Sequence, residues 1–341
     1  MSETSFVDRR SVLKATGGLG VAGLAGCLGG NDEVELTVTH YGGIWEDAMR
    51  DIGDEFESNN DGVTVQLTPY TTVAELEETV DDPTVDVALL DDFDVILGGS
   101  DLFAEIDTDI VTNYDSLYES AYLPGDVGVS QVFDAYGIAY DSEDWSGDDF
   151  QSWSALWDEQ FEGEIAIQDS WIPFMVMGAL AWGGDERNME PLWERLPDLA
   201  DNAAVFYEGF SQPEQLFNQG EVSVASWFGA RTRALRADGL SLDFRIPEEG
   251  ATQIRGAMAV TKNSENVETA QEFVNLNLDP EMQELLAEQL TQGPVNAEAE
   301  LSGELAEQVT TEEELEDLYL PDWEYINGVR DEWLERWGAN V

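Results

Sequence analysis

The side chains that most often carry out catalysis are scarce in this chain of 341 residues. His40 is the only histidine and Cys27 the only cysteine, so neither a Ser-His-Asp nor a Cys-His arrangement can be assembled. A zinc site built from histidine and cysteine ligands is excluded for the same reason. No glycine-rich loop ends in Gly-Lys-Ser or Gly-Lys-Thr to hold a phosphate. We therefore expect a protein that is not an enzyme and that uses neither a metal nor a cofactor, and we interpret His40 as a structural residue.

Carboxylates are the one reactive group that the chain has in excess. Asp and Glu number 73 against 14 Lys and Arg, which gives a formal net charge of −59. Carboxylate pairs are too numerous to single out a glycosidase site, although an extracellular hydrolase that relies on carboxylates stays open as an alternative. The charge disfavours nucleic acid as a partner, because binding phosphates requires a basic surface.

The same acidity is typical of proteins from extreme halophiles. Lysine is nearly absent, with only Lys14 and Lys262, so arginine supplies most of the positive charge. Aromatic residues make up 10% of the chain, which indicates a folded protein rather than an acidic disordered one. Molar salt shortens the Debye length to about 3 Å, so it would screen the repulsion between the carboxylates.

Aromatic residues near the ends of predicted strands are the best candidates for binding chemistry. Tyr41 and Trp45 follow one predicted strand, and Asp92 and Phe93 follow another. Aromatic faces stack on planar or cationic ligands, and each desolvated contact is worth about 1 kcal/mol or more. Core packing is the competing interpretation of Tyr41, Trp45 and Trp227.

The elements that must position these residues alternate between strands and helices. The first set consists of a strand at 34–38, a helix at 45–56, a strand at 63–67, a helix at 73–80 and a strand at 85–90. This order implies parallel pairing through right-handed crossovers. In such sheets, ligands bind beyond the carboxyl ends of the strands, which here are the loops at 41–45 and 91–93. A second α/β set at 164–246 indicates a second lobe, and the strand at 257–260 is expected to return to the first.

The first 27 residues are interpreted as an export signal rather than as part of the fold. Arg9 and Arg10 begin a sequence similar to the twin-arginine motif, and the apolar run that follows is too short to span a bilayer of about 30 Å. The run ends at Cys27 in a sequence similar to a lipobox, so we expect Cys27 to carry a lipid anchor. Residues 28–33 are then a tether, and the protein is expected on the extracellular face of the cell membrane.

Several different short motifs follow one another along the rest of the chain. They are Tyr41-Gly42-Gly43-Ile44-Trp45, residues 133–141, Ser152-Trp153-Ser154-Ala155-Leu156-Trp157, Phe161-Glu162-Gly163, Trp227-Phe228-Gly229, residues 247–251 and Pro294-Val295-Asn296. In this order they resemble the motifs of the polyamine-type (spermidine/putrescine-like) solute-binding proteins of ABC importers. The resemblance covers nearly all of the chain after the leader.

The resemblance implies an α/β protein with the two-lobed type II periplasmic-binding-protein fold, in which a hinge closes the lobes on a ligand cleft. It divides the chain into a first lobe at 34–136 plus 257–300, a second lobe at 137–256 and a C-terminal helical segment at 301–341. Carried over position by position, it implies the ligand-binding residues Tyr41, Trp45, Asp92, Phe93, Phe133, Tyr136, Asp169 and Trp227.

The sequence departs from this family where polyamine binders hold ammonium groups. Two carboxylates of the family are missing after Asp169, and another is missing near Arg255. Arg255 stands where a cation site needs negative charge, so we count it as a further ligand-binding candidate, and Arg231 lies just past Trp227. A ligand with a carboxylate, or a zwitterion, would suit these arginines. A salt bridge to one of the many acids is the alternative role of both.

These observations predict the substrate-binding component of an ABC importer, which captures a small solute and delivers it to a membrane permease. The expected partners are the solute, the permease subunits and, through the lipid anchor, the membrane; the protein itself is expected to be a monomer. A sensory receptor on the same fold is an alternative besides the hydrolase. The ligand stays open among polyamines, amino acids, carboxylates, thiamine and ferric iron. A polyamine could still find negative charge at Asp91, Asp92, Asp134 and Asp169.

Overall fold

A computed structural model describes residues 33–316 and 318–341 of the chain. The predicted leader at 1–27, with the twin-arginine motif and Cys27, lies outside these residues. All of the predicted tether except Glu33 lies outside them as well. Within the described residues, no helix combines the length and the apolar character needed to cross a bilayer.

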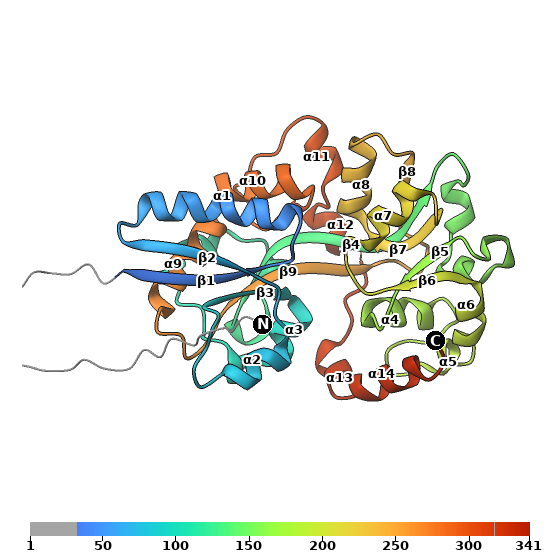
Figure 1. Cartoon of the computed structure of the whole chain (residues 1–341), viewed down its shortest axis with the longest axis horizontal. Coiled ribbons are helices and arrows are strands. Elements are labelled where there is room, and N and C mark those ends of the chain that lie inside the picture. Colours follow the sequence, from blue (N-terminus) through green and yellow to red (C-terminus); the bar gives the residue numbers. More distant parts are fainter. Residues whose placement is uncertain (1–32, 317) are drawn as a thin grey trace, which may run out of the picture. The chain divides into compact units, whose positions relative to one another are not determined.

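One mixed sheet of ten strands runs through the described residues (Figure 1). Its strand order is β2-β1-β3-β9-β4-β7-β5-β6, and β8 and β10 each pair with β4. The strands are β1 (Val34–His40), β2 (Val63–Pro69), β3 (Val87–Asp91), β4 (Val129–Asp141), β5 (Ile165–Gln168), β6 (Ala203–Tyr207), β7 (Val224–Phe228), β8 (Leu242–Arg245), β9 (Thr252–Val260) and β10 (Gly293–Pro294). β1 is parallel to β2 and β3, and β5 is parallel to β6 and β7, whereas β4 and β9 are antiparallel to their neighbours. The α/β class predicted from the sequence is confirmed.

Helices pack on both faces of the sheet (Figure 1). The α-helices are α1 (Ile44–Asn59), α2 (Val73–Thr79), α3 (Asp92–Leu102), α4 (Ile172–Leu180), α5 (Glu190–Trp193), α6 (Leu196–Asn202), α7 (Gln212–Gln219), α8 (Gly229–Ala237), α9 (Val267–Asn277), α10 (Pro280–Leu290), α11 (Glu304–Gln308), α12 (Glu312–Glu316), α13 (Trp323–Asn327) and α14 (Arg330–Gly338). Short 3-10 helices connect several of these elements.

The first strand and helix form for the reasons that the sequence indicates. Leu36 and Val38 are fully buried in β1. The apolar stripe of α1 between Trp45 and Phe56 is buried, and the helix packs on β2 and α10. Burial of this stripe supplies the tertiary contacts that a helix of this length needs in order to be stable in water.

β4 and β9 are the long strands in the middle of the sheet, and they connect its two parts. Their facing residues run from Tyr136 opposite Thr252 to Val129 opposite Met258. The two larger hydrophobic clusters meet on β4, where Ala135 belongs to one cluster and Tyr136 to the other. We call the elements around the cluster of Ala135 the first lobe and those around the cluster of Tyr136 the second lobe. The boundaries predicted from the sequence stay predictions.

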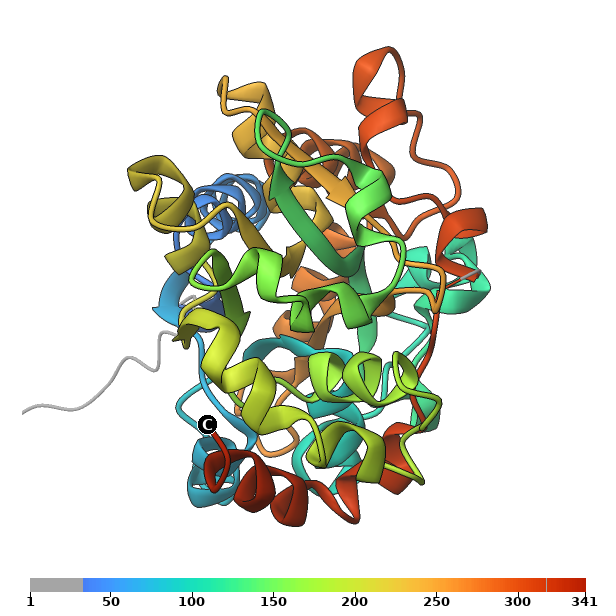
Figure 2. The same ribbon diagram turned by 90° about the vertical axis from the view of Figure 1, so that its right-hand side faces the viewer.

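The C-terminal helices α13 and α14 pack on the second lobe. Trp333 and Trp337 are buried in its hydrophobic cluster, and the rings of Trp337 and Phe174 of α4 lie 6.0 Å apart. Figure 2 shows α14, in red, beside the helices of the second lobe. Leu315 and Leu318, earlier in the chain, belong to the cluster of the first lobe. The C-terminal segment therefore runs from the first lobe to the second.

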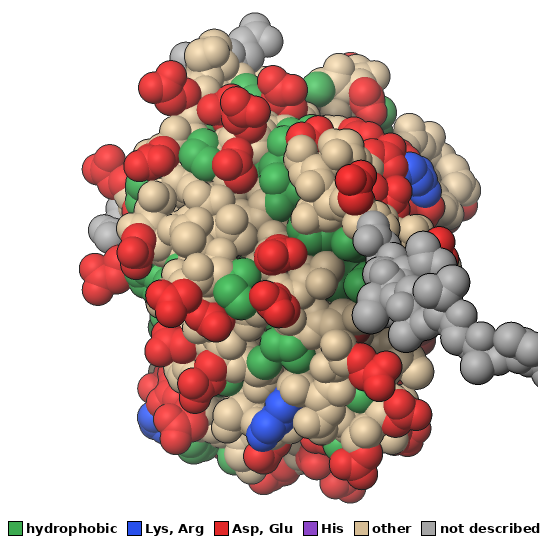
Figure 3. Space-filling view, turned by 90° about the vertical axis from the view of Figure 1, so that its left-hand side faces the viewer, with side chains coloured by type: hydrophobic (Ala, Val, Ile, Leu, Met, Phe, Trp, Pro, Cys, Tyr) green, Lys and Arg blue, Asp and Glu red, His purple; other side chains and the backbone are tan. Residues whose placement is uncertain are grey.

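The surface carries the acidity of the sequence. Figure 3 shows carboxylates spread over one face of the molecule, with few lysine or arginine side chains between them. Several cations that the chain does have are paired: Arg50 with Glu46, Arg236 with Asp243 and Arg336 with Glu190. Most surface carboxylates therefore repel one another through solvent unless salt screens them.

Dialysis from molar KCl into dilute buffer is expected to destabilise the fold. Loss of screening restores the repulsion among the carboxylates in the folded state, which relaxes when the chain expands on unfolding. We expect the melting temperature to fall by roughly 10 °C or more, equivalent to several kcal/mol. Thermal melts followed by circular dichroism across a KCl series measure this. Equal melting temperatures in dilute buffer and in molar salt would contradict it.

Candidate functional site

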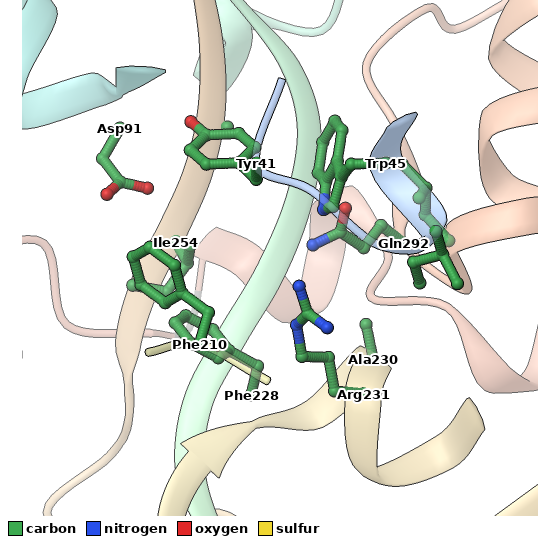
Figure 4. A pocket seen from close by; sticks show the side chains of 12 residues that line it. Tyr41, Trp45, Asp91, Phe210, Phe228, Ala230, Arg231, Ile254 and Gln292 are labelled. Carbon is green, nitrogen blue, oxygen red and sulfur yellow. The ribbon is translucent and has the colours of Figure 1, made fainter. Parts of the chain in front are cut away.

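A cavity lies where the two lobes meet at the central strands. Its volume is about 510 Å³, including the open mouth. The first lobe contributes the loop after β1, the end of β3 and the end of α10, and the second lobe contributes the loop after β6 and the start of α8. The lining residues are Tyr41, Ile44, Trp45, Asp91, Phe210, Phe228, Ala230, Arg231, Ile254, Gly256, Leu290 and Gln292 (Figure 4).

Tyr41 and Trp45 form the aromatic wall from the first lobe. Between them, Gly42 and Gly43 have φ angles of 79° and 59°, a region that residues with a side chain rarely adopt. The backbone N–H of Gly42 donates to Nδ1 of His40 at 3.0 Å, which holds the turn and gives the single histidine a structural role. The turn brings the rings of Tyr41 and Trp45 to a centroid distance of 5.0 Å at an interplanar angle of 67°.

The second lobe provides the opposite aromatic wall. The rings of Phe210 and Phe228 lie 5.7 Å apart, and the ring of Phe210 meets that of Tyr41 edge-on at 6.3 Å across the cavity. Trp171 packs behind Phe210 and Phe228 at 5.8 and 6.2 Å. The two lobes are thus already in contact across the cavity, and these rings present apolar surface to a ligand.

Asp91 brings negative charge to the cavity without a compensating cation. It is 7% exposed, and no hydrogen bond from another described residue reaches its carboxylate. Burial, reinforced by Asp94 and Asp92, raises its pKa well above the usual value of an aspartate. The two neighbouring carboxylates differ, since Asp92 accepts from Arg255 at 2.7 Å and Asp94 accepts from Arg330 at 3.3 Å. A buried, unpaired carboxylate gains most from a cationic ligand.

Arg231 lines another part of the cavity, where its guanidinium forms a salt bridge with Glu214, the alternative role expected for it from the sequence. Its side chain is 12% exposed, and one guanidinium nitrogen donates to Glu214 at 2.7 Å. Beside it, Gln292 has a buried side-chain oxygen without a partner among the described residues. Figure 4 shows Asp91 and Arg231 on different sides of the cavity, with the aromatic side chains between them. The arrangement can hold a ligand with opposite charges at its two ends.

Of the ligand-binding residues predicted from the sequence, Tyr41 and Trp45 line the cavity. Asp92 and Arg255 do not; they form a buried ion pair, with side chains 2% and 6% exposed. Asp169 lies elsewhere as well and accepts a hydrogen bond from the indole of Trp337 at 2.7 Å.

The remaining predicted residues are aromatic and pack in the core around the cavity. Phe133 and Tyr136 are fully buried on β4, and Phe93 packs on Trp323 at 4.8 Å. Trp227 is also fully buried, and its indole N–H donates to the backbone oxygen of Phe210 at 3.0 Å. It therefore supports a lining residue from behind.

Several lining residues are direct neighbours of predicted ones. Asp91 precedes Asp92, Phe228 follows Trp227, and Ile254 and Gly256 flank Arg255 on β9. Successive side chains of a strand point to opposite faces, so a motif locates the strand end but not the face that a given residue occupies. Phe210 belongs to no motif. It follows β6, however, so the rule that ligands bind beyond the carboxyl ends of parallel strands points to it.

Replacing Trp227 with Ala is expected to cost stability, whereas replacing Phe228 with Ala should mainly weaken binding. Trp227 is fully buried, so truncation leaves a cavity and lowers the free energy of unfolding by about 3–5 kcal/mol. Phe228 is 7% exposed and faces the cavity, so its loss removes a wall of the site. Urea unfolding and ligand titration on both variants measure the difference. A Trp227→Ala protein of normal stability with lost binding would instead support the assignment made from the sequence.

Known proteins with the same architecture are found in both sequence and structure comparisons. Spermidine/putrescine-binding periplasmic protein 1 of Haemophilus influenzae is 26% identical over 161 residues, which cover 46% of this chain and 44% of that protein. The alignment thus spans less than half of that relative's length. The crystal structure of an ABC transporter from Clostridium perfringens is 25% identical, with a TM-score of 0.71 over 89% of this chain and 99% of that chain. The structure of a GABA receptor has a TM-score of 0.78 at 20% identity, over 89% of this chain and 97% of that one.

These structural neighbours confirm the two-lobed α/β fold predicted from the sequence. The family match is independent of them and covers residues 51–314, including both lobes and the central strands. Because the matched residues make up more than half of the chain, the protein belongs to the family of bacterial extracellular solute-binding proteins.

Proposed function

We propose that the protein captures a small zwitterionic solute in the cavity between its lobes and delivers it to the permease of an ABC importer. The ammonium group of the solute lies at Asp91, its carboxylate lies at Arg231, and its carbon chain lies between the aromatic walls. The observation that carries this proposal is the buried carboxylate of Asp91, which faces the cavity without a cation while Arg231 lines another side.

The charges of the site favour a zwitterion over an anion or a neutral ligand. An ammonium group at Asp91 restores the ionised carboxylate and replaces the solvation that burial removes. Glu214 accepts from one guanidinium nitrogen of Arg231, and the other N–H groups of that guanidinium would bind the carboxylate of the solute. The aromatic rings between them exclude water, which strengthens both ion pairs.

The relatives support a ligand that carries an amino group. The Haemophilus influenzae protein is named for spermidine and putrescine, and one of the structures is that of a GABA receptor. All three compounds have ammonium groups at neutral pH, and GABA also has a carboxylate. The zwitterion combines what the cavity offers at Asp91 and at Arg231.

A polyamine is the second candidate, and the three aspartates at the start of α3 favour it. Asp91, Asp92 and Asp94 would supply the negative charge that two ammonium groups need. Arg255 and Arg330 already pair with Asp92 and Asp94, however, so among these three only Asp91 is left for the ligand.

Export and anchoring complete the proposal. The family is one of extracellular solute-binding proteins, and the leader predicted at 1–27 would direct the chain across the membrane. A lipid on Cys27 would then hold the protein on the extracellular face, as a monomer close to its permease.

A thermal-shift screen in molar KCl tests the proposal. The compounds are GABA, α-amino acids, putrescine, spermidine, simple carboxylates, thiamine and ferric iron. A ligand that binds only the folded state raises the melting temperature. We expect amino acids to act and simple carboxylates to have no effect. If diamines alone raise the melting temperature, the polyamine assignment replaces the zwitterion. A compound that is consumed during incubation would indicate the hydrolase instead.

A further inference from the structure

Gln292 is a lining residue of the cavity whose backbone is fixed on both sides. Before it, Thr291 caps the C-terminus of α10 with a left-handed φ of 55°. After it, Gly293 begins β10, which pairs with β4. In Figure 4 the amide group of Gln292 lies between the ring of Trp45 and the guanidinium of Arg231. The side chain is therefore held at the wall of the cavity.

Asp134 of β4 determines which end of this amide faces a ligand. Its fully buried carboxylate accepts from the backbone N–H groups of Ala135 at 2.8 Å and of Ala230 at 3.1 Å, and from Arg233 at 3.4 Å. Burial raises the pKa of Asp134, and Arg233 and the hydrogen bonds, one of them from the side chain of Gln292, oppose this rise. A carboxylate surrounded by donors accepts from the Nε2 end of the amide. Oε1 of Gln292 is then the end that is left for a ligand.

The oxygen of this amide requires a hydrogen-bond donor. Oε1 of Gln292 is buried and has no partner within residues 33–316 and 318–341. An amide oxygen can only accept, so a donor on the ligand would replace the hydration that burial removes. Asp134 polarises the amide through Nε2, which increases the negative charge on Oε1. The hydroxyl of Tyr41 is also buried without a partner in the same part of the chain, but a hydroxyl can either donate or accept and does not define the ligand.

We propose that Gln292 determines specificity by accepting a hydrogen bond from an α-ammonium group, and that the solute is an α-amino acid with a second ammonium group at the end of its side chain. This assignment rests on the proposed function and adds a third contact to it. The terminal ammonium lies at Asp91, the carboxylate lies at Arg231, and the α-ammonium lies at Gln292. Ornithine and lysine have these three groups, whereas GABA lacks the α-ammonium and putrescine lacks the carboxylate.

The position of Gln292 next to Arg231 selects an α-amino acid. One carbon of such a compound carries both the carboxylate and an ammonium group, so the two groups need binding partners that are neighbours. An ammonium group alone would be repelled by the guanidinium of Arg231. The carboxylate of an amino acid offsets this repulsion, and so do Glu214, which pairs with Arg231, and Asp134, which lies behind Gln292. A diamine brings no carboxylate to this place.

Matched ligands test the role of the α-ammonium by calorimetric titration of the wild-type protein in molar KCl. The first set is ornithine, δ-aminovalerate without the α-amino group, and putrescine without the carboxylate. Lysine, ε-aminocaproate and cadaverine form a second set that is one carbon longer. We expect the better of the two amino acids to bind roughly ten-fold or more tightly than its counterpart without the α-amino group, because the hydrogen bond involves a charged donor. The D and L enantiomers should differ as well, since they direct the α-ammonium to opposite sides when the other two groups are held.

Gln292→Met removes the amide and nearly keeps the length of the side chain. It should bring both preferences, for the α-amino group and for one enantiomer, close to one, and change the affinity for the counterparts without the α-amino group little. Gln289→Met is the matched control. Gln289 lies near the end of α10, outside the cavity lining, and donates to Asp51 at 2.6 Å, so its replacement should keep both preferences. Thermal melts show whether each variant folds.

Two results would overturn the role of Gln292. One is equal binding of the amino acids and their counterparts without the α-amino group to the wild-type protein, which needs no variant. The other is a folded Gln292→Met protein that keeps the wild-type preferences. In both cases the proposed binding of a zwitterion stands, because δ-aminovalerate and ε-aminocaproate are zwitterions themselves. If none of these amino compounds binds, or if the diamines alone bind, the proposed function fails and this assignment fails with it.

Discussion

Replacing Asp91 with Asn is expected to weaken the binding of an amino compound by about 30-fold or more and to leave the protein at least as stable as before. Loss of one partner of a buried charge pair costs about 2–5 kcal/mol, which corresponds to this change in affinity. Stability should not suffer, because the carboxylate of Asp91 is buried without a hydrogen bond from a described residue and is repelled by Asp92 and Asp94. Titration with the active compound of the screen, GABA or putrescine first, and urea unfolding measure the two effects.

The pH dependence of binding should identify the same carboxylate. The pKa of Asp91 is raised by burial, so in mild acid the folded protein holds a proton that the unfolded chain has already released. The contribution of Asp91 to stability therefore falls as the pH rises from the usual pKa of an aspartate towards the raised one. Affinity for an ammonium group changes in the opposite direction and falls as Asp91 becomes protonated. Asp91→Asn should remove the contribution of Asp91 to both dependences, whereas Asp92, Asp94 and Asp134, whose pKa values burial also raises, keep theirs.

Asp169→Asn is the control for Asp91→Asn. Asp169 is also a predicted ligand-binding carboxylate, but it lies outside the cavity lining and bonds to Trp337. Its replacement should leave the affinity nearly unchanged. Equal losses in the two variants, or unchanged binding in Asp91→Asn, would remove Asp91 from the site and with it the proposed orientation of the ligand.

Replacing Arg255 with Gln is expected to lower the free energy of unfolding by about 3–5 kcal/mol, because it leaves the buried carboxylate of Asp92 without its cation. Arg255 donates to Asp92 through Nε at 2.7 Å and to the backbone oxygen of Ser120 at 2.9 Å. It also opposes the rise in the pKa of Asp92 that burial causes. The double variant with Asp92→Asn should recover a large part of the loss, since no charge is then left unpaired. Urea unfolding measures all three proteins.

An exposed ion pair provides the comparison. Arg236 and Asp243 are 3.1 Å apart, each with a side chain 48% exposed, so Arg236→Gln should cost about 1 kcal/mol or less. If Arg255→Gln instead folds normally and loses ligand affinity, Arg255 contacts the solute, as the sequence suggests.

The sequence predicts the fold well because the patterns that specify it are local. The alternation in β1 and the apolar stripe of α1 appear within single elements, and both are buried as expected. Parallel order then follows from the alternation of strands with helices. The loop from Tyr41 to Trp45 can be predicted as part of the site because it directly follows the first strand, and ligands bind at strand ends.

The site is less predictable because it depends on faces and on partners far away in the chain. Whether Trp227 or Phe228 faces the cavity is decided by the register of β7 against β4, where Trp227 lies opposite Gly137. Arg255 pairs with Asp92 rather than lining the cavity, and these two residues are 163 positions apart in the sequence. Neither the register nor the contact has a local signal, whereas each strand and helix has one.

The central strands also determine what kind of movement the protein can make. β4 and β9 cross from one lobe to the other and stay hydrogen-bonded from Thr252 to Met258, with one irregularity between Ser130 and Val132. Sliding the lobes past each other would break this ladder, whereas bending it would not. A separation of the lobes that admits solute is therefore expected to be a rotation about a continuous backbone hinge, in which the distance between the outer ends of the lobes changes far more than the distance at the hinge. A membrane component that contacts both ends could distinguish a filled protein from an empty one by that span alone, without touching the solute.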